Sequence, residues 1–301
     1  MGLFLAIVTA LFFPGIIIRV KSRLSGRKGP GLMQPWKNIA VLLRKGSVIS
    51  TVTSYIYGLA PVIYLSTIVC AILLIPCPGF PSLPGFEGDF VLFAYLLALG
   101  KFFFIIAAMD TGSSFEGMGA SREALYSMLV EPAFFILFGT LALLTGHTSM
   151  EGIFGAFQFS GHNSFIIGFI GIYLLVQIAM IENSRMPVDD PKTHLELTMI
   201  HEVMILDYSG FDLALIHIGT SLKFAMYGLL VANLLIPSGW NPAAGLVLSF
   251  AIQVVFAGMI GLMESFRARK KLARNPQFIV TLSSIALVAF ILVLLINFKM
   301  I

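Results

Sequence analysis

Continuous apolar stretches of about 20 residues recur along the whole chain, and no other feature constrains its fold as strongly. An α-helix rises about 1.5 Å per residue, so about 20 apolar residues cross the hydrocarbon core of a bilayer. Hydrophobic residues make up 58% of the chain and charged residues 11%, which excludes an ordinary soluble domain. We therefore expect an all-α integral membrane protein in which residues 1–301 form one polytopic domain. Eight transmembrane helices are predicted, at about 2–18, 51–76, 89–109, 124–146, 164–182, 212–236, 241–264 and 276–299.

Basic residues gather on one side of this predicted topology. Sixteen of the 19 lysines and arginines fall in the loops that lead from an odd-numbered span to the next even-numbered one. The loops on the opposite side carry acids but no lysine or arginine. Loops rich in lysine and arginine stay in the cytoplasm. We therefore expect a protein of the cell inner membrane with both termini external and cytoplasmic loops at about 19–50, 110–123, 183–211 and 265–275. Within these loops, 35–45 and 192–206 mix apolar and charged residues at helical spacing, which predicts amphipathic connectors.

Several kinds of site are excluded by missing ligands. With only two cysteines, Cys70 and Cys77, the chain lacks the thiolates that an iron–sulfur cluster requires. The pair His201-Glu202 begins like a zinc-protease motif, but Ile205 stands where the second histidine is required. We therefore expect no cofactor, no metal and no catalytic residue in this chain, so that redox chemistry belongs to partner subunits.

Charged residues inside apolar runs are candidates for proton transfer. Glu131 lies about two turns into the fourth predicted span, where we expect it to face the bundle interior, either protonated or paired. The alternative is a neutral glutamic acid that makes a hydrogen bond between helices. Lys101 and Lys223 lie inside the third and sixth spans, and Lys223 is the stronger candidate for a buried ion pair. His217, in the same span as Lys223, is either a titrating group or a core histidine bonded to the backbone.

Three blocks of polar motifs recur in one known family. The first is RLSGRKGP at 23–30 with QP at 34–35, and the second is DTGS at 110–113 with MGASRE at 118–123 and EP at 131–132. The third is ENSRMPVDDP at 182–191, followed by HLEL at 194–197, HE at 201–202 and DYSG at 207–210. Together they resemble the membrane subunit of energy-converting (group 4) NiFe hydrogenases, of the formate hydrogenlyase type, which is homologous to a membrane subunit of complex I, the NADH:quinone oxidoreductase.

The resemblance implies a non-catalytic membrane subunit of an oxidoreductase complex. Such a subunit anchors cytoplasmic hydrogenase-type large and iron–sulfur subunits, which carry the iron–sulfur clusters and the NiFe centre. It links their redox events to proton or sodium movement toward antiporter-like membrane subunits. By the same resemblance, Arg27 and Arg185 are ion partners and anchors for this soluble head. The relay and coupling residues that the resemblance implies are Glu131, Glu182, Asp189, Glu196, Glu202 and Asp207. Lys223 joins them because of its position inside the sixth span.

The chain also departs from the hydrogenase pattern, and two other functions remain as alternatives. Asn38 stands where an acid follows the Gln-Pro pair, and Val41 and Gly46 replace polar residues, so the connector after the first span has lost charge. One alternative is a quinone-binding membrane component of a complex I relative, which needs a lipid-accessible chamber near spans one and six. The other is an autonomous secondary transporter, although the two related halves typical of that class are not evident.

Overall fold

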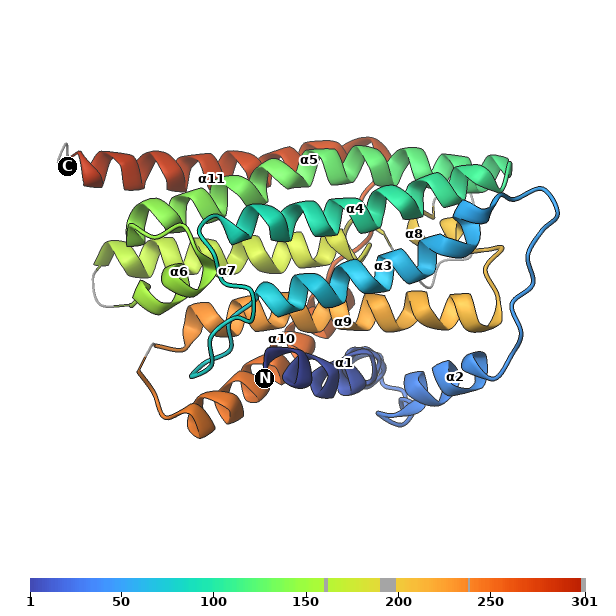
Figure 1. Cartoon of the computed structure of the whole chain (residues 1–301), viewed down its shortest axis with the longest axis horizontal. Coiled ribbons are helices and arrows are strands. Elements are labelled where there is room, and N and C mark those ends of the chain that lie inside the picture. The colour runs from blue at the N-terminus through green and yellow to red at the C-terminus, as the bar shows by residue number, and fades with distance from the viewer. Residues whose placement is uncertain (160–161, 190–198, 238, 299–301) are drawn as a thin grey trace.

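The protein is a bundle of long helices that lie side by side (Figure 1). The computed structural model describes residues 1–159, 162–189, 199–237 and 239–298. In this part of the chain eight helices are long and apolar enough to cross a membrane, which confirms the predicted all-α membrane fold. They are α1 (Gly2–Leu24), α3 (Tyr55–Leu74), α4 (Asp89–Asp110), α5 (Ser114–Thr145), α7 (His162–Glu182), α9 (Gly210–Leu235), α10 (Pro242–Phe266) and α11 (Asn275–Asn297).

Shorter helices lie between the spans. They are α2 (Gln34–Leu43), α6 (Met150–Ala156), α8 (His201–Met204) and the 3-10 helix η1 (Leu272–Arg274). Helix α2 confirms the connector predicted at 35–45. Helix α8 covers only the end of the connector predicted at 192–206, and residues 190–198 lie outside the described part of the chain.

Two spans are longer than the apolar runs that predicted them. Helix α1 continues to Leu24, and α5 begins at Ser114, so most of the segment expected to be a loop at 110–123 is helical. The apolar run stops at the first charged residues, but a helix continues where those residues find partners. Glu116 accepts a hydrogen bond from the Asp207 backbone N–H at 3.2 Å, and Glu123 pairs with Lys101 at 3.0 Å.

Helix α9 is the centre of the bundle. It packs against α1, α2, α3, α7 and α10. In its most apolar stretch 78% of the residues are buried, compared with 28% in α11. Helix α11 lies along one edge of the bundle, beside α5 (Figure 1). Polar residues on α9 are therefore enclosed by protein, whereas much of α11 is left exposed.

Candidate functional site

Four charged side chains of alternating sign form a continuous buried row, called the charge chain below. The Lys101 ammonium lies 3.0 Å from a Glu123 oxygen and 2.9 Å from a Glu182 oxygen. The second Glu182 oxygen lies 2.8 Å from the Lys223 ammonium. Lys101 also donates a hydrogen bond to Ser127 Oγ at 2.8 Å. The charge chain thus runs Glu123, Lys101, Glu182, Lys223, and each of these side chains is at most 9% exposed.

Each member of the charge chain comes from a different helix. Lys101 lies on α4, Glu123 on α5 and Lys223 on α9, while Glu182 is the last residue of α7. Because the carbonyls at a helix C-terminus lack intrahelical partners, they attract cations. The Lys223 ammonium occupies such a position at the end of α7, where it also donates a hydrogen bond to the Glu182 backbone carbonyl at 2.8 Å. Gly100 lets α3 approach α4 here, because a side chain at that position would collide with Thr67.

The alternation of sign makes this burial possible. An unpaired ion removed from water costs several kcal/mol, even after the protein relaxes around it. In the charge chain two lysines face two carboxylates, so every charge has an opposite neighbour within about 3 Å. A change of protonation at one member removes a counter-charge from the next. The row is therefore suited to passing a change of charge from one helix to another.

A second cluster of charges ties the end of α10 to its neighbours. Glu264 lies 3.0 Å from the Lys21 ammonium and 3.3 Å from Arg185 Nη1. The Arg185 guanidinium also lies over the Phe224 ring, 5.0 Å from its centroid. The ion partner of Arg185 is thus Glu264, which is not among the predicted coupling acids, and the Arg185 side chain is only 18% exposed.

Asp189 fixes the segment that follows α7. Its carboxylate lies 2.9 Å from Arg269 Nη2 and accepts hydrogen bonds from the backbone N–H groups of Ile200 and His201, at 3.1 and 3.3 Å. One predicted coupling acid therefore joins the loop after α10 to the start of α8.

Glu131 does not face the bundle interior, contrary to expectation. The buried face of α5 runs through Glu123, Ser127, Val130 and Phe134, at helical spacing. Glu131 follows Val130 and is therefore turned about 100° around the helix, onto the exposed face. It lies there in a groove of about 580 Å³ whose wall also contains Lys101. The structure thus places Glu131 beside the charge chain and outside it.

The remaining predicted acids are dispersed. Glu202 is partly buried and lines the cavity described below, whereas the Asp207 residue is exposed and Glu196 lies outside the described residues. The sequence predicted a loop at 110–123, which contains Glu123, and favoured Lys223 over Lys101. The missed signal is helical spacing, because Glu123 lies four residues before Ser127 on the buried face of α5.

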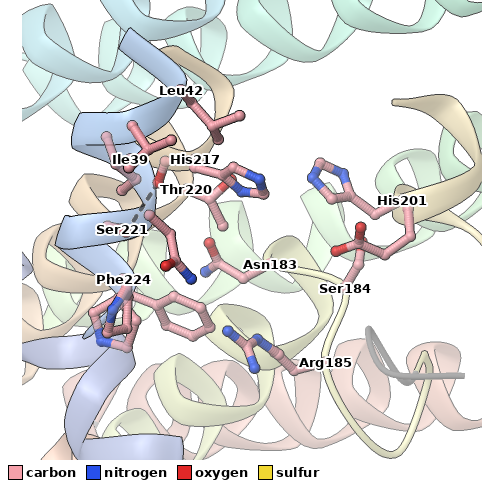
Figure 2. Close-up of a pocket in the computed structure, with 15 residues that line it drawn as sticks. Ile39, Leu42, Asn183, Ser184, Arg185, His201, His217, Thr220, Ser221 and Phe224 are labelled. Carbon is pink, nitrogen blue, oxygen red and sulfur yellow. Dashed lines mark hydrogen bonds between the residues drawn. The ribbon is translucent and has the colours of Figure 1, made fainter. Parts of the chain in front are cut away.

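A cavity of about 540 Å³ opens next to the charge chain. Its wall is formed by Pro14 of α1, by α2, by the His217–Phe224 part of α9, by residues 183–185 and by α8. The imidazole rings of His201 and His217 are turned toward each other across it (Figure 2). Ser184, in the same wall, donates a hydrogen bond to Glu123 at 3.3 Å. The cavity is thereby linked to the charge chain through one hydroxyl group.

His201 is expected to make the folded chain sensitive to acid. Burial disfavours the imidazolium and lowers the pKa of His201 from 6.5 to about 4. Between these values the unfolded chain binds a proton that the folded chain does not, so stability falls as the pH falls from about 6.5 to 4. His201→Phe, which can keep the ring stacked on Phe104, should flatten this dependence of the thermal midpoint. The exposed His147→Phe is the control, and an equal effect of both variants would contradict the assignment.

Among the described residues, no group of three or more His, Cys, Asp or Glu side chains is placed to hold a metal ion. The expectation that this chain carries no cofactor stays a prediction.

The sequence is similar to that of known proteins along nearly its whole length. The sequence model of the NADH dehydrogenase family matches residues 1–296. The chain belongs to this family. Hydrogenase-4 component C of Escherichia coli (strain K12) is 33% identical over 229 residues, which are 75% of this chain and 71% of that protein. Formate hydrogenlyase subunit 4 of the same strain is 29% identical over 284 residues, 92% of each chain.

Two further similarities are more distant. A subunit of the NADH-quinone oxidoreductase of Ralstonia pickettii (strain 12J) is 24% identical over 71% of this chain and 62% of that protein. A chain in the structure of the membrane-bound sulfane sulfur reductase, an archaeal respiratory membrane complex, has the same fold. It matches with a TM-score of 0.82 and 20% identity, over 97% of this chain and 100% of that one. The resemblance to hydrogenase-type subunits is confirmed, and the chain is a multi-pass membrane protein of this family.

Proposed function

We propose that this chain is the anchoring and coupling subunit of a membrane-bound hydrogenase complex. It links redox chemistry in a cytoplasmic iron–sulfur and NiFe head to proton or sodium movement through the membrane. The relatives named hydrogenase-4 component C and formate hydrogenlyase subunit 4 support this choice of complex. The inner membrane as its location and external termini remain part of the proposal.

The observation that carries the proposal is the charge chain. Ionisable residues inside membrane spans are rare and expensive to bury, and they typically mark ion or proton pathways. The Glu123 end of the charge chain is linked to the cavity through Ser184. Near Lys101 the bundle surface carries the groove that holds Glu131. The charge chain thus lies between the cavity, on the Glu123 side, and Glu131, in the groove beside Lys101.

Coupling follows from the shared counter-charges. Suppose a proton enters at the cavity and neutralises Glu123: Lys101 then keeps Glu182 as its only carboxylate partner within 4 Å among the described residues. Because Glu182 is also the partner of Lys223, a stronger pull by Lys101 weakens the second pair. An electrostatic change at the cavity is transmitted in this way across α4, α7 and α9, and this transmission does not require a redox centre in the chain.

Charge reversal at Arg27 tests whether the basic loop holds the soluble head. Arg27 is exposed, unlike Arg185, and its substitution should leave the bundle intact. Arg27→Glu should weaken retention of the iron–sulfur subunits by about tenfold, with a stronger effect at low salt, because like charges then meet across the interface. Affinity purification of the tagged chain followed by subunit quantification measures this.

The matched control is Glu87→Lys, a charge reversal of equal size and opposite sign at an exposed loop residue predicted to lie on the opposite side. If both variants retain the head like the wild type at every salt concentration, docking through Arg27 is excluded. Equal loss in both variants would indicate general damage to assembly instead.

A second candidate function is quinone binding, and the cavity favours it. The quinone alternative required a chamber near spans one and six, and the cavity of about 540 Å³ lies between α1 and α9. This volume is within the range of ligand pockets. A photoreactive quinone analogue distinguishes the two functions, since saturable labelling of α1 or α9 would support quinone binding and a lack of labelling would leave coupling without quinone.

A further inference from the structure

A basic cleft lies where α11 begins, away from the charge chain. It has a volume of about 480 Å³ and is lined by Arg269, Lys270, Lys271 and Arg274, and by the first turns of α11, Gln277 to Thr281. Four of the seven residues that line it are therefore cationic, and none is acidic. The positive charge of this cleft favours the binding of an anion.

The four cations differ in how they are engaged. Arg269 is paired with Asp189 at 2.9 Å, and the Lys270 ammonium lies over the Phe278 ring at 3.6 Å from the centroid. In the part of the chain that the structure describes, the exposed side chains of Lys271 and Arg274 enter no ion pair. Lys271 and Arg274 thus remain to bind a ligand, while Arg269 and Lys270 contribute to the structure of the cleft.

The cleft continues along α11 into an exposed surface that becomes apolar with distance from the cleft. The hydroxyl-bearing Thr281 and Ser284 and then the apolar Val288 follow Gln277 at helical spacing, and all three are exposed. Leu287 and Ile291 widen this stripe, being 47% and 45% exposed. Helix α11 is one of the eight apolar spans, so the stripe runs from the edge of the membrane toward its middle. A ligand that fills both parts needs an anionic head and a long apolar tail.

We propose that this cleft and stripe form a binding site for one anionic phospholipid, with the headgroup phosphate on Lys271 and Arg274 and an acyl chain along α11. Basic pockets at the ends of membrane helices bind acidic headgroups, and each lysine or arginine near the surface contributes about 1 kcal/mol. A free phosphate would use the cleft but leave the apolar stripe uncovered. An acidic protein segment would match the cations, but it would leave uncovered the part of the stripe that lies within the membrane.

The test measures lipid retention by the purified full-length chain. The chain is placed in mixed micelles with phosphatidylglycerol or with zwitterionic phosphatidylcholine, and bound lipid is counted by native mass spectrometry. We expect one tightly held phosphatidylglycerol. Lys271→Gln combined with Arg274→Gln should weaken it about 30-fold, which corresponds to about 2 kcal/mol at about 1.4 kcal/mol per tenfold. The control pair Arg23→Gln and Lys28→Gln removes two exposed charges from the end of α1 and the loop after it, and should leave retention unchanged.

A third variant and a soluble competitor identify the ligand. Val288→Asp places an acid on the stripe while leaving the cleft intact, and it should also weaken retention, because the tail then meets a charge. Equal retention of the two lipids, or equal loss in the control pair, would overturn the proposal. Displacement of phosphatidylglycerol by millimolar inorganic phosphate, or an unchanged affinity in Val288→Asp, would show a site for a soluble anion instead. A co-purifying protein that occupies the cleft in place of lipid would also overturn it.

Discussion

Replacing Glu182 with glutamine is expected to lower the free energy of unfolding by about 3–5 kcal/mol and to stop coupled ion movement. Glu182 is the shared partner of Lys101 and Lys223, at 2.9 and 2.8 Å. Its loss leaves two buried lysines with a single carboxylate, Glu123, and removing one partner of a buried pair costs about that much. Denaturation of the purified chain in detergent measures stability, and proton movement in vesicles containing the whole complex measures coupling.

A second substitution separates the two effects. Glu182→Gln combined with Lys223→Met restores equal numbers of buried lysines and carboxylates, so most of the lost stability should return. Ion movement should stay absent, because the row is still interrupted. The exposed Glu87→Gln is the control and should change neither quantity. If Glu182→Gln is as stable as the wild type and fully coupled, the charge chain has no part in either the fold or the function.

Replacing Glu131 with glutamine is expected to abolish coupled ion movement while the complex still assembles. Glutamine keeps the shape and the hydrogen bonding of glutamate but cannot ionise, so it tests ionisation alone. Because Glu131 is exposed on α5, its side chain supports little internal packing, and Glu131→Leu should also leave the chain folded. Proton movement in vesicles, measured together with the redox activity of the head, gives both results.

The contrary outcome is equally specific. If Glu131 is only a neutral hydrogen-bonding group against another helix, glutamine should preserve coupling and leucine should cost about 1 kcal/mol of assembly stability. Wild-type coupling in Glu131→Gln would remove this residue from the pathway. Loss of coupling in both variants, with assembly intact, supports an ionising role at the groove shared with Lys101.

The sequence by itself determined the class of fold. Length and hydrophobicity specify each span locally, since every apolar run long enough to cross a bilayer must satisfy its own backbone as a helix. The eight spans, the connector at α2 and the family therefore follow from residues close together in the chain. The end of α1 and the start of α5 did not, because hydrophobicity does not show how far a helix continues into charged residues, and at Glu123 the partner, Lys101, comes from another helix.

Only the tertiary structure decided which charges belong together. Lys101 and Glu182 are 81 positions apart, and nothing local indicates that α4 and α7 place them 2.9 Å from each other. Whether an acid is buried depends on its angle around the helix: Glu123 and Glu131 lie on the same span, yet one joins the charge chain and the other faces outward. Arg185 similarly meets Glu264 because the end of α10 lies beside the segment that follows α7. The sequence supplies the charges, and the packing angles of the helices pair them.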